Sequence, residues 1–431
     1  MKKITAGLLV AAMMLSITGC GSNQQSTNNP DNSGVIHSNA TSGIDNGTLQ
    51  PEEGAKLVIW EDGNDRIRYM EYVAEKFKEK YGIEVEIQNV FGADLSSRLM
   101  QDAPSNLGPD LYEIPHDGLG TVIAAGLVQP NDNTVEKIKS DFIESAATCL
   151  TYDDQVYGYP LSISTYALIY NKALVNTPAD TFQEIADFAK TFNVPKENKY
   201  ALMWQVGSAY YSHCLLAGYG AYVFGDNGTN TEDIGLNNEG AINGAAFFRS
   251  LKDVLDIKSA DADAQMIDGF FTSGKLAYTI NGQWAVTNYK NAGIDVGVAP
   301  LPKLPNGENA VSYLGVQAIC ISAYSNYPNA AKLFAEMATS EEMLLKRYEI
   351  THEIPPIKSA LDSEAIISDP ISAAFLQQAQ NSTAMPFISQ MGLVWDPYMR
   401  ALKSIWDNDT DPKTALDECV NIINSSIETQ K

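Results

Sequence analysis

The sequence predicts an α/β protein whose folded part is divided into two lobes. Strand-like and amphipathic helical segments alternate along the chain, as they do in βαβ units. The same alternation begins again beyond Pro160. The part of the chain that follows Lys56 is also longer than one hydrophobic core usually organises. Together these three observations favour two α/β lobes over a single core.

The first 20 residues have the pattern of an export signal. Lys2 and Lys3 precede the apolar run 6–15, which is too short to span a bilayer. Residues 15–20, LSITGC, then resemble the bacterial lipobox, and the resemblance implies that Cys20 is acylated and becomes the mature amino terminus. We therefore expect an extracytoplasmic protein anchored to the cell membrane through Cys20. An ordinary secretory signal that ends beside a cysteine is the alternative.

A polar segment separates this signal from the folded part. Residues 21–55 are rich in Asn, Ser, Thr, Gly and Gln and contain few large apolar side chains. Such a composition cannot bury enough surface to offset the entropy of the ordered chain. We predict a flexible stalk over 21–55.

Charge and cysteine content restrict the partners. The chain has 29 Lys and Arg against 53 Asp and Glu, a net charge of -24, which argues against nucleic acid and anionic lipid surfaces as partners. Besides Cys20 there are four widely spaced cysteines, without the spacing of a zinc or redox motif. We expect buried thiols, with one disulfide as the alternative outside the cell. The four cysteines are Cys149, Cys214, Cys320 and Cys419.

The first folded segment predicts a βαβ unit. Residues 56–60 form an apolar strand, and apolar side chains at three- and four-residue steps mark one face of a helix over 67–81. Gly82 can end this helix in the left-handed conformation, and residues 83–87 alternate as a strand does. The two strands should therefore be parallel. We expect a further strand at 109–114.

The second folded segment repeats this pattern. Residues 168–170 are strand-like, and the capping box 181–184 predicts a helix that continues to Phe192. Residues 200–204 and 276–280 predict further strands, and the prolines between 297 and 307 exclude regular structure there. Later helices are expected at 330–338, 341–348 and 397–406.

Ligands of open α/β sheets bind beyond the carboxyl ends of the strands. Aromatic and carboxylate side chains follow most of the strands predicted here. Aromatic faces stack on the apolar faces of pyranose rings, while carboxylates and amides bind sugar hydroxyls, so the combination indicates a sugar site. Core packing is the alternative for each aromatic residue. The candidate residues are Glu61, Asp62, Asp117, Trp204, Tyr210, Trp284 and Trp395.

Several of these segments resemble the maltose/maltodextrin-binding proteins of ABC importers and occur in the order of that family. The resemblance implies a bilobal periplasmic-binding-protein fold, type II-like, in which the chain crosses several times between lobes that close on an α-glucan. It carries no cofactor and no metal. The segments are KLVIW (56–60), GPD (108–110), HD (116–117), GYP (158–160), LIYNK (168–172), YALM (200–203), INGQW (280–284) and MPFISQMGLVW (385–395).

The resemblance also implies roles for single residues. It matches Trp284, Trp395 and Tyr210 to sugar-stacking positions and Asp117 to a carboxylate that binds hydroxyls. Charged ligands are expected on the loop that follows the first strand, and Trp204 is a further candidate for stacking. That loop carries Glu61, Asp62, Asp65 and Arg66.

The chain departs from the family pattern at four of these positions. Ile114 stands where the family has a stacking tryptophan, and Gly118 stands where it has an arginine. Ser164 and Ser208 stand where it has glutamates, and Ser164 is retained as a candidate ligand residue. The identity of the glucan therefore does not follow from the resemblance.

The resemblance also sets the expected lobe boundaries and partners. The first lobe should comprise 56–162 and 318–360, and the second 163–317 and 361–431. We expect a monomer that binds an oligosaccharide of the maltodextrin type and delivers it to the permease subunits of an ABC transporter. Another oligosaccharide or a peptide is the alternative ligand. A glycoside-active enzyme would need two carboxyl groups held across one bond, and no motif indicates such a pair, so we do not expect an enzyme.

Histidines give no support to a metal-binding receptor. The four in the chain are far apart in sequence, and His37 lies in the predicted stalk. The other three are His116, His213 and His352.

Overall fold

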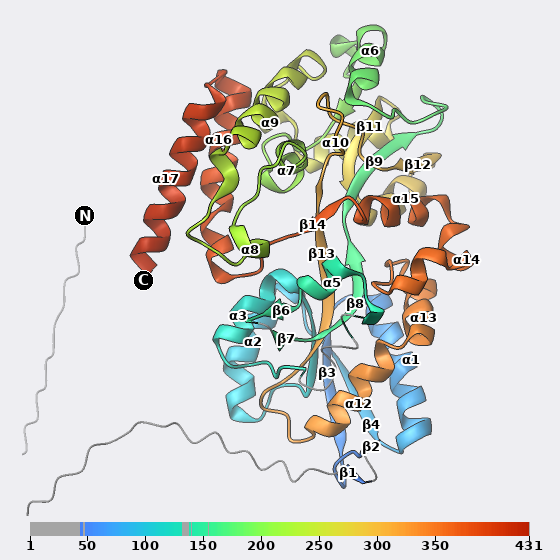
Figure 1. The fold of residues 1–431 in the computed structure, drawn as a ribbon. Coiled ribbons are helices and arrows are strands. Elements are labelled where there is room, and N and C mark those ends of the chain that lie inside the picture. The colour runs from blue at the N-terminus through green and yellow to red at the C-terminus, as the bar shows by residue number, and fades with distance from the viewer. Residues whose placement is uncertain (1–43, 46–47, 132–137, 139, 154, 431) are drawn as a thin grey trace, which may run out of the picture. The chain divides into compact units, whose positions relative to one another are not determined.

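A computed structural model describes residues 44–45, 48–131, 138, 140–153 and 155–430 (Figure 1). The predicted signal peptide, Cys20 and most of the predicted stalk lie outside these residues. The described residues belong to one compact unit. Its strands are β1 Ile44–Asp45, β2 Thr48–Leu49, β3 Lys56–Glu61, β4 Glu84–Asn89, β5 Leu111–Pro115, β6 Thr151–Tyr152, β7 Gln155–Val156, β8 Tyr159–Ser164, β9 Tyr166–Asn171, β10 Tyr200–Met203, β11 Leu276–Gly282, β12 Val296–Ala299, β13 Ser312–Ile321 and β14 Ser382–Ala384.

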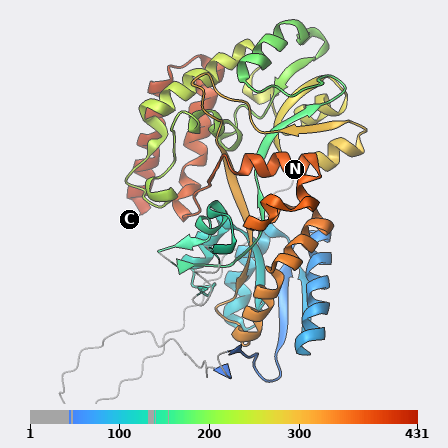
Figure 2. The same cartoon turned by 45° about the vertical axis from the view of Figure 1, so that its right-hand side comes forward.

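Helices surround two larger sheets (Figures 1 and 2). They are α1 Asn64–Tyr81, α2 Gly92–Asp102, α3 Leu119–Ala124, α5 Glu144–Thr148, α6 Phe182–Phe192, α7 Ala209–Ala217, α8 Gly225–Gly228, α9 Glu239–Ser250, α10 Ala264–Thr272, α11 Gln283–Asn291, α12 Pro328–Ala338, α13 Glu341–Thr351, α14 Glu364–Ile367, α15 Pro370–Ala379, α16 Trp395–Asn408 and α17 Pro412–Gln430. Two short 3-10 helices, η7 Lys358–Asp362 and η8 Ser389–Leu393, flank α14, α15 and β14.

The first sheet has the strand order β14-β13-β5-β3-β4, and β8 also pairs with β13. Strands β3 and β4 are parallel and joined by α1, which confirms the predicted βαβ unit. Helix α1 ends at Gly82, whose φ of 70° is left-handed, as the sequence predicted. Helices α12 and α13 pack beside α1.

The second sheet has the strand order β10-β11-β9-β12, in which β10 and β11 are parallel. Three of its four strands coincide with strands predicted from the sequence. The fourth, β12, corrects the expectation that regular structure is excluded between 297 and 307: residues 297–299 pair with β9, and the first of the prolines, Pro300, directly follows the strand. The predicted capping box begins α6: the side chain of Thr181 accepts a hydrogen bond from the Glu184 backbone N–H at 3.2 Å. The Glu184 carboxylate reaches back to the N–H of Asp180, one residue before the cap.

Strands β8 and β13 link the two sheets and were not predicted. Strand β8 ends one residue before β9 begins, and β13 pairs with both β8 and β14 (Figures 1 and 2). Three neighbouring hydroxyl side chains connect these segments by hydrogen bonds. Thr165 Oγ1 lies 2.7 Å from Ser312 Oγ, which in turn lies 2.7 Å from Ser382 Oγ.

We propose two lobes divided as the sequence analysis expects, with most of each sheet in one lobe; β14 and residues 312–317 of β13 belong to the first sheet but fall in the expected second lobe. The boundary at 162/163 falls within β8, and the boundary at 317/318 falls within β13 at a register shift between Gln317 and Ala318. The boundary at 360/361 falls in η7. The proposed crossings are therefore continuous hydrogen-bonded strands and a 3-10 turn, not loose linkers.

The end of the predicted stalk belongs to the folded unit, which corrects its boundary at residue 55. The side chain of Leu49 packs against the hydrophobic core. The carboxylate of Glu52 accepts hydrogen bonds from the backbone N–H groups of Asn329 and Ala330, at 2.7 and 3.0 Å. A carboxylate is stabilised at a helix amino terminus by unpaired N–H groups, here those of α12. Composition alone does not reveal this long-range contact.

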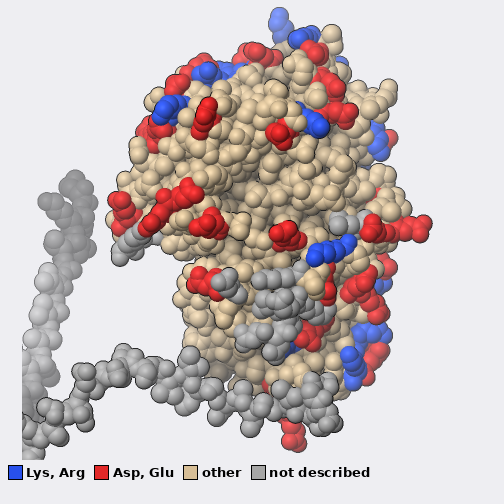
Figure 3. Space-filling model, viewed as in Figure 1, with Lys and Arg blue, Asp and Glu red and all other residues tan. Residues whose placement is uncertain are grey.

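The cysteines and the surface charges are arranged as the composition led us to expect. Cys149, Cys214, Cys320 and Cys419 are buried free thiols. On the face shown in Figure 3, carboxylates and scattered cations cover both halves without a large basic patch. Among the described residues, no helix is both long enough and apolar enough to cross a membrane.

Candidate functional site

Three aromatic residues from separate segments meet beside β13. The rings of Tyr210 and Tyr313 are stacked, with centroids 5.9 Å apart, and the ring of Trp395 meets Tyr313 edge-on at 6.3 Å. Tyr210 lies in the first turn of α7, and Trp395 is the first residue of α16. Both predicted stacking residues are partly exposed, whereas Tyr313 is buried beneath them.

Trp284 extends this aromatic group on its other side. Burial raises the pKa of Tyr211 and the Trp284 side chain opposes that rise, so the two side chains lie close together; Tyr211 packs edge-on against Tyr210 at 5.1 Å. Trp284 has 51% of its surface exposed, an unusual value for a tryptophan and one that leaves a ring face available. Ring contacts through Tyr313 therefore join Tyr210 to Trp395, and Tyr211 lies between Tyr210 and Trp284.

Gly282 sets the position of the Trp284 ring. A Cβ atom at residue 282 would lie 2.1–2.3 Å from three carbon atoms of that ring, because the indole folds back over the end of β11. Any side chain here must displace the indole.

We expect Gly282→Ala to weaken oligosaccharide binding by about tenfold, the usual consequence of losing roughly 1.4 kcal/mol of contact energy. Its melting temperature should stay near that of the wild type, since Gly282 has φ -90°, which alanine adopts readily. Binding titrations and thermal melts of this variant check the expectation, with Gly269→Ala as the surface control, since Gly269 is exposed and a Cβ atom there would meet nothing within 4 Å. Undiminished binding would show that the orientation of Trp284 is irrelevant.

Asp117 lies within electrostatic range of the aromatic group. It follows β5 in a short turn, and its side chain is exposed. Burial raises the pKa of Tyr210, and the charges of Tyr211 and Asp117 contribute further to that rise. Ser164, at the end of β8, is partly exposed and contacts Gly315.

His116 holds Asp117 in place and is not available as a metal ligand. Its Nδ1 accepts a hydrogen bond from the Val316 N–H at 3.2 Å, so its Nε2 donates to the Met385 carbonyl at 3.0 Å. This arrangement requires the neutral imidazole, and burial lowers the pKa of His116 accordingly. Within the described ranges, no group of His, Cys, Asp and Glu side chains has the arrangement of a metal site.

The charged residues expected on the loop after β3 lie in β3, in the loop and in the first turn of α1, and they divide into exposed and buried side chains. Asp65 is exposed and paired with Arg68 at 2.9 Å, and Asp62 is partly exposed. Arg66 is partly exposed and forms an ion pair with Glu353 at 2.6 Å. Glu61, by contrast, is only 1% exposed, which corrects its assignment as a residue in contact with sugar. Glu61 is the last residue of β3, and this end of the strand is buried on both faces, as Ile59 and Trp60 also are.

The structure also corrects the assignment of Trp204 as a stacking residue, because its side chain lies in the hydrophobic core. It is fully buried, its Nε1 donates to Ser212 Oγ at 3.0 Å, and its ring packs edge-on against Trp406 at 5.7 Å. A ring covered on all sides cannot stack on a ligand. Trp60, the other tryptophan at a strand end, is buried as well, as expected.

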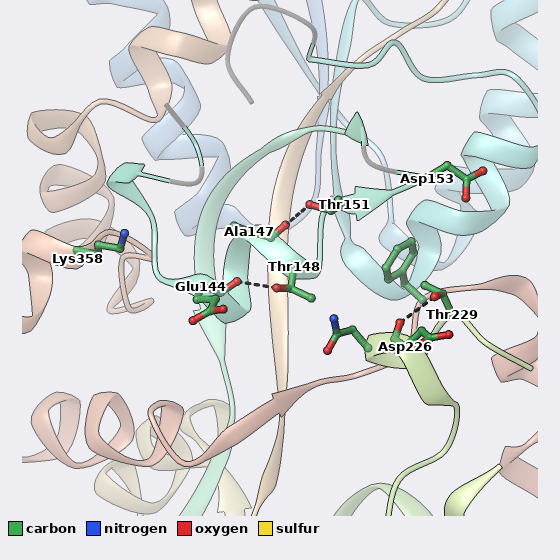
Figure 4. A pocket seen from close by; sticks show the side chains of 10 residues that line it. Glu144, Ala147, Thr148, Thr151, Asp153, Asp226, Thr229 and Lys358 are labelled. Atoms are coloured by element: carbon green, nitrogen blue, oxygen red, sulfur yellow. Dashed lines mark hydrogen bonds between the residues drawn. The ribbon is translucent and has the colours of Figure 1, made fainter. Parts of the chain in front are cut away.

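A cavity of about 680 Å³ lies elsewhere, between α5, β6, α8 and η7 (Figure 4). None of the predicted site residues lines it. Its lining is mostly hydroxyl and carboxylate groups, and its one aromatic residue, Phe387, is buried with its ring edge-on to Tyr152. Lacking an exposed ring face, this cavity fits a sugar less well than the aromatic group does.

Sequence reasoning missed Tyr313, because no strand was predicted around it. Tyr211 was not among the candidate residues either. The largely apolar run 313–321, interrupted only by Gly315 and Gln317, could have revealed the strand that carries Tyr313.

Comparisons with known proteins agree with this fold. The family model described as bacterial extracellular solute-binding protein matches residues 72–374. A galactooligosaccharide-binding protein of Bacillus subtilis is 30% identical over 100% of this chain and 98% of its own length. A maltooligosaccharide ABC transporter solute-binding lipoprotein of Streptococcus pneumoniae is 30% identical over 84% of this chain and 86% of its own.

A solved structure is similar over nearly the whole fold. The cyclo/maltodextrin-binding protein complexed with maltotetraose is 37% identical and superposes with a TM-score of 0.82, covering 87% of this chain and 98% of its own. The predicted bilobal periplasmic-binding-protein fold is thereby confirmed. From its fold and from the match over 72–374, the chain belongs to the family of bacterial extracellular solute-binding proteins.

Proposed function

We propose that this protein is the substrate-binding component of a carbohydrate ABC importer and captures oligosaccharides of the maltodextrin type by closure of its two lobes. The observation that carries the proposal is the aromatic group that extends from Trp284 through Tyr210 to Trp395, with the Asp117 carboxylate within electrostatic range of it. Ring faces with a carboxylate nearby suit a chain of pyranose units. The names of the pneumococcal relative and of the maltotetraose complex support the same ligand class.

Galactooligosaccharides are the second candidate ligand. The relative that matches the chain from end to end is named for them. The chain also lacks four residues of the maltodextrin pattern, at Ile114, Gly118, Ser164 and Ser208. Three of these changes alter hydroxyl-binding groups and one, at Ile114, removes a stacking tryptophan, whereas Trp284, Tyr210 and Trp395 are retained, so the changes bear on the choice of sugar more than on sugar binding itself.

The role we propose is binding without catalysis. The relatives compared above are all named as binding proteins. Glycoside hydrolysis needs two carboxyl groups on opposite sides of the scissile bond, whereas Glu61 is buried against Glu113 and away from solvent.

The location we propose is the outer face of the cell membrane, with a lipid anchor at Cys20 and the permease subunits of the importer as partners. The family is extracellular, and the pneumococcal relative is named as a lipoprotein of an ABC transporter. The lipobox-like residues 15–20 support the anchor. We propose a monomer without cofactors.

A thermal-shift panel of the purified protein tests the function. It comprises maltotriose, a galactooligosaccharide, a xylo-oligosaccharide and a tripeptide. A ligand that binds only the folded state raises the melting temperature, by an amount set by its concentration relative to Kd. We expect maltotriose to give the largest rise. A rise with the peptide alone, or with none of the four, would exclude an oligosaccharide receptor.

A further inference from the structure

Two buried tyrosines contact the partly exposed rings of the aromatic group. Tyr166, the first residue of β9, is fully buried, and Tyr313, the second residue of β13, is 1% exposed. Neither residue was predicted to belong to the site. Because a buried ring cannot touch a sugar, any effect of these two residues on binding must act through the rings that they contact.

Tyr313 supports two of the predicted stacking residues with its ring. The Tyr210 ring is stacked on it with an interplanar angle of 26°, and the Trp395 ring meets it edge-on at 80°. The ring of His213 is also stacked on Tyr313, with centroids 4.4 Å apart. Contacts of these kinds favour defined relative orientations of aromatic rings. One buried ring therefore helps to orient both stacking rings.

The hydroxyl group of Tyr313 takes no part in these contacts. Its oxygen is buried and has no hydrogen-bond partner among the residues that the structure describes. A buried hydroxyl without a partner adds no hydrogen bond to the folded state, and removing it from water costs free energy. The ring of Tyr313 is thus the part of the side chain that supports Tyr210 and Trp395.

Tyr166 contributes its hydroxyl group instead. This hydroxyl donates to the Tyr210 carbonyl at 2.8 Å and accepts a hydrogen bond from the Tyr313 N–H at 3.3 Å. One oxygen atom thereby connects the backbone of α7, which carries Tyr210, with the backbone of β13. The Tyr166 ring also packs edge-on against the Tyr210 ring, with centroids 5.0 Å apart.

The backbone of Tyr313 is fixed by neighbouring segments. Tyr313 pairs with Thr383 of β14 in a parallel ladder, and its carbonyl accepts a hydrogen bond from Thr165 Oγ1 at 2.8 Å. A ring on a fixed backbone has a defined position before any ligand arrives. Rings that are already ordered lose less conformational entropy when a ligand binds, which increases affinity.

We propose that Tyr313 and Tyr166 are positioning residues for oligosaccharide binding. The ring of Tyr313 and the hydroxyl of Tyr166 hold Tyr210 and Trp395 in the arrangement that the sugar rings contact. The inference rests on the proposed function and deepens it, since it names two residues that act on affinity without touching the ligand.

The same substitution at the two positions should affect maltotriose affinity differently. Tyr313→Phe removes a hydroxyl without a partner and should bind within about twofold of the wild type. Tyr166→Phe removes two hydrogen bonds, one of them to the backbone of Tyr210, and should weaken binding about 3- to 10-fold. Isothermal titration calorimetry measures both affinities. A Tyr313→Phe variant that binds as weakly as one without the ring would overturn the role of that ring.

Removal of the Tyr313 ring should have the larger effect. We expect Tyr313→Leu to weaken maltotriose binding about 5- to 30-fold. In the Trp395→Ala background the factor should be at least about threefold smaller, because one of the two rings that Tyr313 supports is already absent. Tyr313→Met takes its place in the cycle if Tyr313→Leu does not fold. Equal factors in both backgrounds would overturn the assignment of Tyr313 as a positioning residue for Trp395.

Phe77→Leu is the control for a general loss of stability. Phe77 is fully buried in α1 and packs against the rings of Tyr81 and Phe334. Its substitution should lower the melting temperature as Tyr313→Leu does and leave maltotriose affinity within about twofold of the wild type. Equal losses of affinity in Phe77→Leu and Tyr313→Leu would show an effect of stability alone and overturn the inference.

The wild-type protein separates this inference from the proposed function. Wild-type affinity of folded Tyr313→Leu and Tyr166→Phe variants would overturn the inference and leave oligosaccharide binding standing. If the wild-type protein binds neither maltotriose nor the galactooligosaccharide, the proposed function fails, and the inference fails with it.

Discussion

Replacing Arg347 with Met is expected to lower the free energy of unfolding by about 3–5 kcal/mol, because it leaves buried carboxylates without their cation. Arg347 is fully buried and is the partner of both Glu113 and Glu353. Methionine fills much of the space, so the loss reflects charge more than volume. Urea unfolding followed by circular dichroism measures it.

The pH dependence of that loss follows from Glu353. Burial alone would raise the pKa of Glu353, but Arg347 and Arg66 outweigh burial and lower it to about 2. A carboxyl group whose pKa is depressed in the folded state adds stability above its unfolded pKa of about 4.3, and this stability is lost as the pH falls toward 2. The stability of the wild-type protein should therefore fall between about pH 5 and pH 2, and that of Arg347→Met should fall less.

Arg68→Met is the control for Arg347→Met. Arg68 is exposed and bonds only Asp65 among the contacts described for it, so the substitution should change the unfolding free energy by less than about 0.5 kcal/mol. A decrease in the unfolding free energy of less than about 1 kcal/mol for Arg347→Met would contradict the claim that the buried ion pairs of Arg347 with Glu113 and Glu353 stabilise the fold.

Trp204→Ala is expected to lower the stability of the fold, whereas Trp284→Ala is expected to weaken oligosaccharide binding. Trp204 is fully buried against Trp406, so its truncation should cost about 3–5 kcal/mol of stability. Trp284 is half exposed, so its truncation should change the melting temperature little and weaken maltotriose binding by about 10- to 100-fold.

Melting curves and maltotriose titrations of both variants check this pair, and Trp395→Ala should behave as Trp284→Ala does. Tight binding by a folded Trp284→Ala variant would remove that ring from the site. A Trp204→Ala variant that melts normally but binds poorly would restore Trp204 as a sugar ligand.

Much of the fold could be predicted because its signals are local. The strand at Lys56, the helix that ends at Gly82 and the capping box at Thr181 each follow from a few neighbouring residues. The resemblance to a family added the two-lobed arrangement, which local patterns do not contain. It also selected Trp284, Tyr210 and Trp395 from the many aromatic residues.

The rest depends on contacts between residues far apart in the chain. Strand β13 takes its place from pairing with β5, β8 and β14, and its residues carry no turn or cap that would mark it. Glu113 and Arg347 are 234 residues apart. The same limit applies to Trp204, whose sequence neighbours do not show that Trp406 covers its ring.

The most direct test of oligosaccharide binding by this site is a crystal structure of the protein with maltotriose. We expect the sugar rings to lie against Trp284, Tyr210 and Trp395, with hydroxyls bonded to Asp117. A sugar bound only in the cavity beside Glu144 and Asp226 (Figure 4), or density for no sugar at saturating concentration, would contradict the proposed site.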